Sequence, residues 1–82
     1  MNISVEISMY PLHSKFEEPI LAFIEKLHNY ENIEIITNTM STQIFGEYHT
    51  VLGALSPEIE KVFRDAPTTI MVMKMVNQNL QP

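Results

Sequence analysis

The sequence contains no cysteine and no tryptophan, and only two glycines among its 82 residues. Without cysteine the chain can form no disulfide, no thiolate nucleophile and no cysteine-ligated zinc site. Small secreted domains usually depend on disulfides, so this absence favours a reducing, cytoplasmic environment. Two glycines, Gly46 and Gly53, are too few for a glycine-rich phosphate-binding loop. The sequence therefore predicts a cytoplasmic domain that is held together by its hydrophobic core.

Basic residues and long apolar runs are also scarce. Five Lys and Arg residues stand against ten Asp and Glu residues, for a formal net charge of −5. Nucleic-acid binding depends on neutralising phosphates with lysine and arginine, so we expect no nucleic-acid partner. No apolar run approaches the roughly 20 residues that span a bilayer. The alternating N-terminus also lacks the charged and apolar regions of a signal peptide, so no membrane partner is expected.

Two hydrophobic periods follow one another along the chain. Residues 3–10 alternate between apolar and polar side chains, which predicts a strand that Pro11 ends. Three-to-four spacing then predicts a helix from about Phe16 to residues 29–32, with Ser14 and Glu17 as a capping box and Pro19 in its first turn. Residues 33–39 and 42–49 predict two strands of a hairpin.

The last third of the chain predicts a second helix and a last strand. Apolar positions between residues 51 and 63 have helical spacing, but Pro57 cannot sit comfortably inside a helix. We therefore expect a short helical turn, a break with Ser56 as N-cap, and a main helix over residues 57–64. Residues 68–76 predict a strand that is apolar on both faces apart from Lys74, which indicates an interior strand or one covered by another subunit.

The order β-α-β-β-α-β predicts an α+β, ferredoxin-like sandwich over residues 1–78, with residues 79–82 as a loose C-terminal tail. Both helices would cover one face of a four-stranded antiparallel sheet. Gly46, on the covered face, would let a helix come close, or else would mark a bulge. The opposite face, here called the open face, would carry a mixed polar and aromatic set: Ser4, Glu6, Ser8, Tyr10, Ile36, Asn38, Phe45 and Glu47.

Catalytic arrangements are not evident in the sequence. The three histidines, His13, His28 and His49, fall in different elements without metal-ligand spacing. No Gly-x-Ser-x-Gly elbow accompanies the serines. We therefore expect a binding protein rather than an enzyme, without a metal or a cofactor.

Two groups of side chains are candidates for binding a ligand. Glu6 and Glu47 would lie on neighbouring strands of the open face, where carboxylates could accept the amine hydrogens of a cation or an aminopyrimidine. The rings of Tyr10, Phe45 and Tyr48 would lie nearby and could hold a cation. The alternative is that these are solvated acids and core or interface rings.

The second group is the stretch NTMSTQIFGE, residues 38–47, which occupies a hairpin position without the Asn-Gly or Asp-Gly pair of a tight turn. Its polar side chains could bond their own backbone or a ligand.

The stretches ISMYPL and TNTMSTQIFGE, together with the order of elements, resemble the YkoF-like thiamine-binding family. Members show Ser-x-Tyr-Pro-Leu on the first strand and Met-Ser/Gly-Thr-x-Ile-x-Gly-Glu leading into the third. The matching positions are Ser8, Tyr10, Met40, Ser41, Thr42, Gly46 and Glu47. The resemblance implies non-catalytic binding of thiamine or its hydroxymethylpyrimidine moiety, in thiamine salvage or transport. It also implies a homodimer or a dimer of dimers.

The same resemblance implies roles for individual side chains. The segment from Asn38 to Thr42 would form a wall against the pyrimidine ring. Glu47 or Glu6 would receive the amino group or balance the thiazolium charge, and Tyr10 or Phe45 would stack on a ring. Other interpretations remain: a regulatory module for another small molecule, a purely structural oligomerisation domain and, more distantly, a cofactor-free oxygenase of the dimeric α+β-barrel type.

Overall fold

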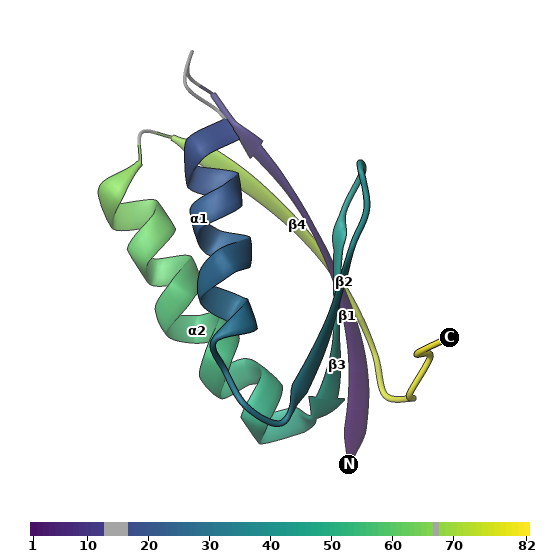
Figure 1. Ribbon diagram of the computed structural model, residues 1–82. Helices are drawn as coiled ribbons and strands as arrows, with labels where there is room; N and C mark the ends of the chain where they lie inside the picture. The colour runs from purple at the N-terminus through teal and green to yellow at the C-terminus, as the bar shows by residue number, and fades with distance from the viewer. Residues whose placement is uncertain (13–16, 67) are drawn as a thin grey trace.

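The computed structural model describes residues 1–12, 17–66 and 68–82 of the chain. Its elements are β1 (Asn2–Pro11), α1 (Glu17–His28), β2 (Ile33–Thr37), β3 (Thr42–Glu47), α2 (Tyr48–Asp65) and β4 (Thr69–Val76). The strands form one antiparallel sheet in the order β2-β3-β1-β4, and both helices lie over one face of it (Figure 1). The predicted ferredoxin-like α+β fold is confirmed.

The core lies between the sheet and the two helices. The apolar residues of β1 alternate toward the helices, and Val5 and Ile7 each expose 2% of their surface. Leu27 of α1 and Leu55 of α2 meet them from the helical layer and expose 0% and 1%. Strand alternation and helical spacing therefore bury the same cluster from two sides. Ser14 and Phe16 of the predicted helix start, and His13 before them, lie outside the described residues.

The junction between β3 and α2 lies two residues earlier than the sequence predicts. Tyr48 and His49 begin α2 instead of ending the strand. Glu47 is the N-cap: its Oε1 accepts hydrogen bonds from the backbone N–H groups of His49 at 3.0 Å and Thr50 at 3.1 Å. These two N–H groups, at the first turn of α2, have no carbonyl partner within the helix. The negative carboxylate also interacts favourably with the positive N-terminal end of the helix dipole.

The predicted break in the second helix is wrong, because α2 is continuous from Tyr48 to Asp65 with Pro57 inside it. Proline withholds the N–H that would bond the carbonyl of Gly53, four residues earlier. Both positions are exposed, so water can hydrate that carbonyl. The buried residues Val51 and Val62, on either side of Pro57, keep both halves packed on the core.

Gly46 marks a close approach of α2 to the sheet and not a bulge. It pairs in register with Ile3 of β1 and Ile33 of β2, so no residue is inserted. A Cβ built on Gly46 would lie 3.1 Å from Cγ2 of Val51 in α2, which is tighter than ordinary contact. The prediction that glycine lets the helix come close is confirmed.

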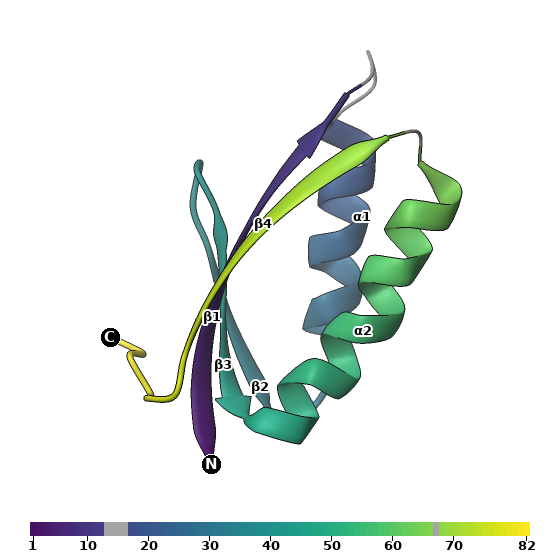
Figure 2. The same cartoon turned by 180° about the vertical axis from the view of Figure 1, so that it is seen from behind.

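β4 is an edge strand and pairs with β1 alone, so an interior position within this chain is excluded. Residues 77–82 leave its end and cross to the side of the sheet away from the helices (Figures 1 and 2). Residues 79–82, predicted to be a loose tail, contain no helix or strand. The Ser4 hydroxyl nevertheless donates to the Gln78 carbonyl at 2.7 Å and accepts from the Leu80 N–H at 2.8 Å. The open face is therefore partly covered, and Phe45 on it exposes only 4% of its surface.

No helix in the described part of the chain is long and apolar enough to cross a membrane.

Candidate ligand-binding site

The hairpin between β2 and β3 is closed by an asparagine side chain. Oδ1 of Asn38 accepts hydrogen bonds from the backbone N–H groups of Met40 at 2.8 Å and Ser41 at 2.9 Å, and the Asn38 N–H donates to the Ser41 carbonyl at 3.0 Å. Among the described non-glycine residues, a positive φ occurs at Asn32 and not at this tip. The turn therefore needs no glycine, since the Asn38 side chain replaces the turn's backbone contacts. β2 consequently ends at Thr37, two residues before the predicted end.

Glu6 joins the hairpin tip to the edge strand. Its Oε2 accepts a hydrogen bond from the Ser41 hydroxyl at 2.9 Å, and its Oε1 lies 2.9 Å from Nζ of Lys74 on β4. The Lys74 ammonium and the Ser41 hydroxyl lower the pKa of Glu6, in that order of effect, and Glu6 raises the pKa of Lys74. The carboxylate is thus ionised at neutral pH and has acceptor capacity left for a further donor.

A pocket of about 130 Å³ lies beneath the hairpin tip, between β1, the hairpin and α1. We call it the hairpin pocket. Its polar wall comes from the hairpin and β1, and its apolar floor from β1 and α1; it is lined by Ile7, Ser8, Met9, Ile20, Phe23, Ile24, Thr37, Asn38, Thr39, Met40, Ser41 and Thr42. Five of the predicted ligand residues, Ser8, Asn38, Met40, Ser41 and Thr42, therefore line one cavity.

Thr42 is the most deeply placed polar residue of this wall and exposes 6% of its surface. Within the described residues its hydroxyl makes no hydrogen bond, although buried polar groups in proteins nearly always have a partner. Ser8, by contrast, donates to the Met40 carbonyl at 3.4 Å, a long contact. The hairpin pocket therefore offers a buried hydroxyl that is free to bond a ligand.

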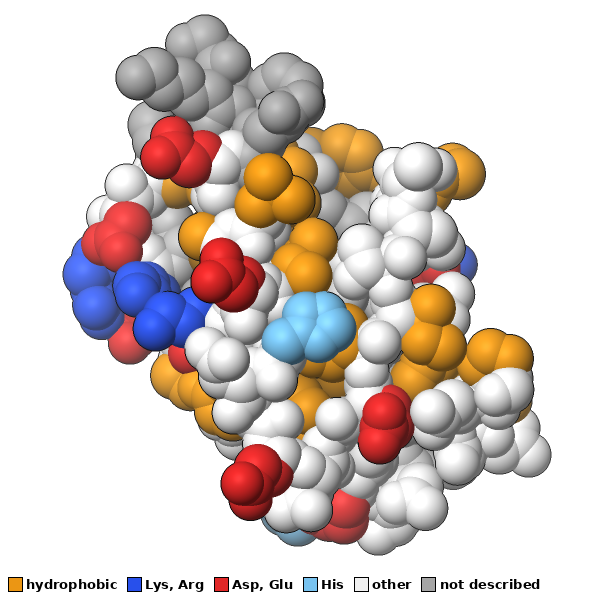
Figure 3. Space-filling model, viewed as in Figure 1, with side chains coloured by type: hydrophobic (Ala, Val, Ile, Leu, Met, Phe, Trp, Pro, Cys, Tyr) orange, Lys and Arg blue, Asp and Glu red, His pale blue; other side chains and the backbone are white. Residues whose placement is uncertain are grey.

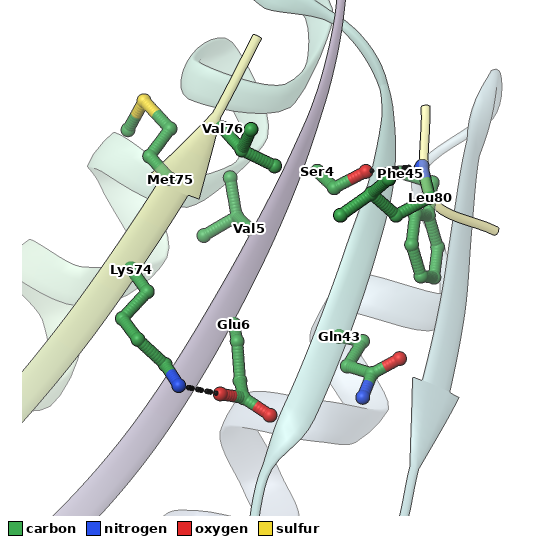
Figure 4. A pocket seen from close by; sticks show the side chains of 9 residues that line it. All are labelled: Ser4, Val5, Glu6, Gln43, Phe45, Lys74, Met75, Val76 and Leu80. Atoms are coloured by element: carbon green, nitrogen blue, oxygen red, sulfur yellow. Dashed lines mark hydrogen bonds and ion pairs between the residues drawn. The ribbon is translucent and has the colours of Figure 1, made fainter. Parts of the chain in front are cut away.

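A second, larger hollow of about 330 Å³ lies on the open face. We call it the open-face pocket. Figure 4 shows the Glu6–Lys74 ion pair at one end and Phe45 beside Leu80 of the C-terminal segment at the other, with Gln43 between them. The two supporting residues that the sequence predicted, Glu6 and Phe45, line this pocket and not the hairpin pocket.

Two other predicted residues lie apart from both pockets. Glu47 is opposite Asn2 at the far end of β3, whereas Glu6 is opposite Gln43, so the predicted neighbourhood of the two carboxylates is wrong. The His49 N–H, followed by Thr50, keeps the pKa of Glu47 low, as expected for a helix cap. Tyr10 is opposite Ile70 and exposes 54% of its surface. The rings of Tyr10, Phe45 and Tyr48 therefore do not form one cluster.

Sequence reasoning missed several contributors to these pockets, among them Lys74 on β4 and the apolar residues Ile20, Phe23 and Ile24 on α1. Lys74 could have been found from strand register, because β4 must pair with β1 in this fold and places it opposite Glu6. The role of α1 depends on how far the helix stands from the hairpin, which no sequence period encodes.

The described acidic residues and histidines do not gather into a metal site. In the part of the chain that the structure describes, no three His, Asp or Glu side chains come together as metal ligands. Figure 3 shows the acidic side chains as separate spots across the helical face. On this face the negative charge is thus spread over several places.

No protein-family model matches the sequence, and no curated protein matches it. Several solved structures share its fold. A proposed thiamine biosynthesis/salvage protein from Thermotoga maritima is 15% identical with a TM-score of 0.82, and the match covers 95% of this chain and 85% of that one. An uncharacterised protein from Methanocaldococcus jannascii is 20% identical with a TM-score of 0.78, covering 99% and 84%. A domain of unknown function, DUF77, from Bacillus cereus is 14% identical with a TM-score of 0.78, covering 98% and 79%. At these identities the matches show a shared fold.

Proposed function

We propose that this protein binds thiamine or its hydroxymethylpyrimidine moiety without chemical turnover, and that the hairpin pocket holds the pyrimidine ring. The observation that carries the proposal is the convergence of Ser8, Asn38, Met40, Ser41 and Thr42 on one cavity. The resemblance of the same stretches to thiamine-binding proteins supports the choice of ligand. The Thermotoga maritima structure, described as a proposed thiamine biosynthesis/salvage protein, supports it at the level of the fold.

The size of the hairpin pocket fits part of the ligand. An apolar cavity of about 150 Å³ accommodates benzene, so a pocket of about 130 Å³ has room for one six-membered ring and not for all of thiamine. Phe23 and Ile24 of α1 would contact the ring, and the thiazolium would extend toward the surface. The acidic balance of the chain and the nearby Glu6 favour a cationic group there.

The polar side chains of the hairpin pocket match the hydrogen-bonding groups on the edge of a pyrimidine ring. An aminopyrimidine offers ring nitrogens as acceptors and an amino group as a donor. The hydroxyl of Thr42, which bonds no described residue, can donate to a ring nitrogen, and the Ser41 hydroxyl oxygen, whose own hydrogen goes to Glu6, can receive the amino group. Glu47 and Tyr10 have no part in this arrangement, because each lies away from the hairpin pocket.

Calorimetric titration tests the proposal on the wild type, on Thr42→Val and on Ser56→Ala, a control that removes an exposed hydroxyl from α2. Thiamine, hydroxymethylpyrimidine and thiamine phosphate are titrated in turn. We expect micromolar binding, about −8 kcal/mol. Thr42→Val should weaken it about five- to tenfold, the worth of one neutral hydrogen bond, and Ser56→Ala should not.

Stability separates this role from a structural one. Since no described residue bonds the Thr42 hydroxyl, Thr42→Val should leave the melting temperature unchanged or raise it. Binding that is equally tight in Thr42→Val would refute the hairpin pocket as the site. No heat with any of the three compounds would refute the ligand class, and conversion of thiamine on incubation would refute the absence of turnover.

A further inference from the structure

The open-face pocket is separate from the hairpin pocket and has the size of a small-molecule site. Its volume of about 330 Å³ lies within the range of about 300–1,000 Å³ that such sites occupy. None of the residues that line it also lines the hairpin pocket. It therefore has room for a ligand of its own, and its side chains indicate which kind.

A polar row of side chains crosses three strands at one end of the open-face pocket. Glu6 of β1 is paired with Gln43 of β3 on one side and with Lys74 of β4 on the other. Paired residues point to the same face of a sheet, so these three side chains stand in a line about 10 Å long. Figure 4 shows Lys74 and Gln43 on either side of Glu6, whose Oε1 lies 2.9 Å from Nζ of Lys74. We call these three residues the polar row.

An apolar row crosses the same strands two residues further along, about 7 Å away. Here Ser4 of β1 is paired with Phe45 of β3 and with Val76 of β4. The Ser4 hydroxyl bonds the backbone of Gln78 and Leu80, which holds the C-terminal segment over this end. Val76 and Leu80 still expose 37% and 58% of their surface. This end of the pocket can therefore bury a further apolar group.

The charges of the polar row determine which head group can bind beside it. The Lys74 ammonium can donate further hydrogen bonds to an anion, and Glu6 and the carbonyl oxygen of Gln43 can accept hydrogen bonds from a cation. An anion alone would also lie close to the Glu6 carboxylate, and a cation alone would lie close to Lys74. A zwitterion places each of its charges against the opposite charge of the ion pair, so it avoids both repulsions.

We propose that the open-face pocket binds a free α-amino acid with a large apolar side chain. The carboxylate of the ligand contacts Lys74, and its ammonium group contacts Glu6 and Gln43. Its side chain lies between Val76 and Leu80, because the apolar row is close enough to the polar row for one molecule to contact both. The proposal does not rest on thiamine binding, since the two pockets share no lining residue.

Titration followed by the NMR shifts of the backbone amides tests the ligand class. The probes are L-phenylalanine, phenethylamine, which lacks the carboxylate, and 3-phenylpropionate, which lacks the ammonium group. We expect L-phenylalanine to saturate with a Kd of about 1 mM or lower. Each analogue should bind at least about tenfold more weakly, because it loses a charge-assisted contact. The shifts should centre on the two rows and the C-terminal segment and not on residues 38–42, and excess thiamine should not displace L-phenylalanine.

Substitution of Lys74 tests the head-group contact. Lys74→Met keeps the length of the side chain and removes its charge, so it should weaken L-phenylalanine binding at least about tenfold. It should also strengthen phenethylamine binding, because the amine no longer meets the Lys74 ammonium, and a loss of folding could not produce that gain. Lys61→Met removes an exposed lysine from α2 and should leave the binding of both probes unchanged.

Substitution of Leu80 tests the apolar end. Leu80→Ala should weaken L-phenylalanine binding about three- to tenfold through lost apolar contact. Leu21→Ala is the matched control, since Leu21 lies on α1 with 62% exposure against 58% for Leu80, and it should bind as the wild type does. Circular dichroism checks that every variant folds.

Four results would each overturn the proposal. The first is no saturation by L-phenylalanine up to about 10 mM. The second is an analogue that binds the wild type as tightly as L-phenylalanine. The third is wild-type affinity for L-phenylalanine in both Lys74→Met and Leu80→Ala. The fourth is displacement of L-phenylalanine by thiamine, which would place both compounds in one pocket.

Discussion

Alanine substitution at the two glycines of this chain is expected to change stability in opposite directions. A Cβ at Gly46 would lie 3.1 Å from Val51 Cγ2 and 3.2 Å from the carbonyl oxygen of Asn32. Val51 is fully buried, and Asn32 holds a left-handed backbone with φ of 67°, so neither neighbour can easily move. At Gly53, in the interior of α2, the added Cβ would meet nothing within 4 Å apart from its chain neighbours and the backbone of its own helix.

The magnitudes follow from these surroundings. Overpacking costs about 1–3 kcal/mol, and alanine regains about 0.5–1 kcal/mol over glycine in a strand, so Gly46→Ala should lower the free energy of unfolding by about 1 kcal/mol. Alanine is favoured over glycine inside a helix by about 1 kcal/mol, so Gly53→Ala should raise it by that amount. In a domain of this size each change moves the melting temperature by about 4–8 °C.

Urea unfolding followed by circular dichroism gives both free energies, and equal m-values confirm that the variants differ in stability alone. A Gly46→Ala variant as stable as Gly53→Ala would refute the close approach of α2 to the sheet. Gly46 lies about 14 Å from Thr42 along β3, so folded Gly46→Ala should bind thiamine as the wild type does. A loss of affinity without a loss of stability would place Gly46 in the binding site instead.

Two further substitutions test the second helix. Pro57→Ala should raise the free energy of unfolding by about 1–3 kcal/mol, because alanine supplies the N–H that the Gly53 carbonyl lacks; an unchanged urea midpoint would contradict this. Glu47→Gln should lower the melting temperature at neutral pH, where the low pKa keeps the capping carboxylate ionised. A lowered pKa stabilises the fold above the ordinary carboxyl range, and this stabilisation is lost as the pH falls through it. The difference in melting temperature between wild type and variant should therefore shrink from about pH 5 to about pH 3, and a constant difference would contradict the cap.

The fold could be predicted because each element carries its own period. The alternation of Ile3, Val5 and Ile7 requires a strand with one buried face, and the order of elements then allows few arrangements. The errors fall where tertiary packing outweighs a local rule. Pro57 ought to end a helix, but Val51 and Val62 bury on both sides of it and hold α2 together. Tyr48 continues the strand pattern, but Glu47 caps a helix there.

The candidate site was predicted in its residues better than in its geometry. The hairpin residues Asn38 to Thr42 are contiguous, so they had to lie together wherever the chain placed them. Side chains from different elements meet only through register and twist. Register places Glu6 opposite Gln43 and separates it from Glu47, and the twisted sheet leaves Tyr10 beyond the hairpin. The carboxylate pair and the aromatic cluster that the sequence predicted therefore do not form.

The positions that resemble thiamine-binding proteins divide into two groups at opposite ends of β3. Ser8, Met40, Ser41 and Thr42 line the hairpin pocket, whereas Gly46 and Glu47 lie about 14 and 17 Å away along the strand. There, one lets α2 approach the sheet and the other caps it. A glycine followed by a glutamate would stabilise this strand-to-helix junction in any chain that has it, whether or not the chain binds a ligand. A loss of thiamine binding on substitution of Glu47 would thus be ambiguous between a lost contact and a destabilised helix. The Thr42 hydroxyl bonds no described residue, so we expect its removal to leave the fold intact and to isolate the contribution of the ligand contact.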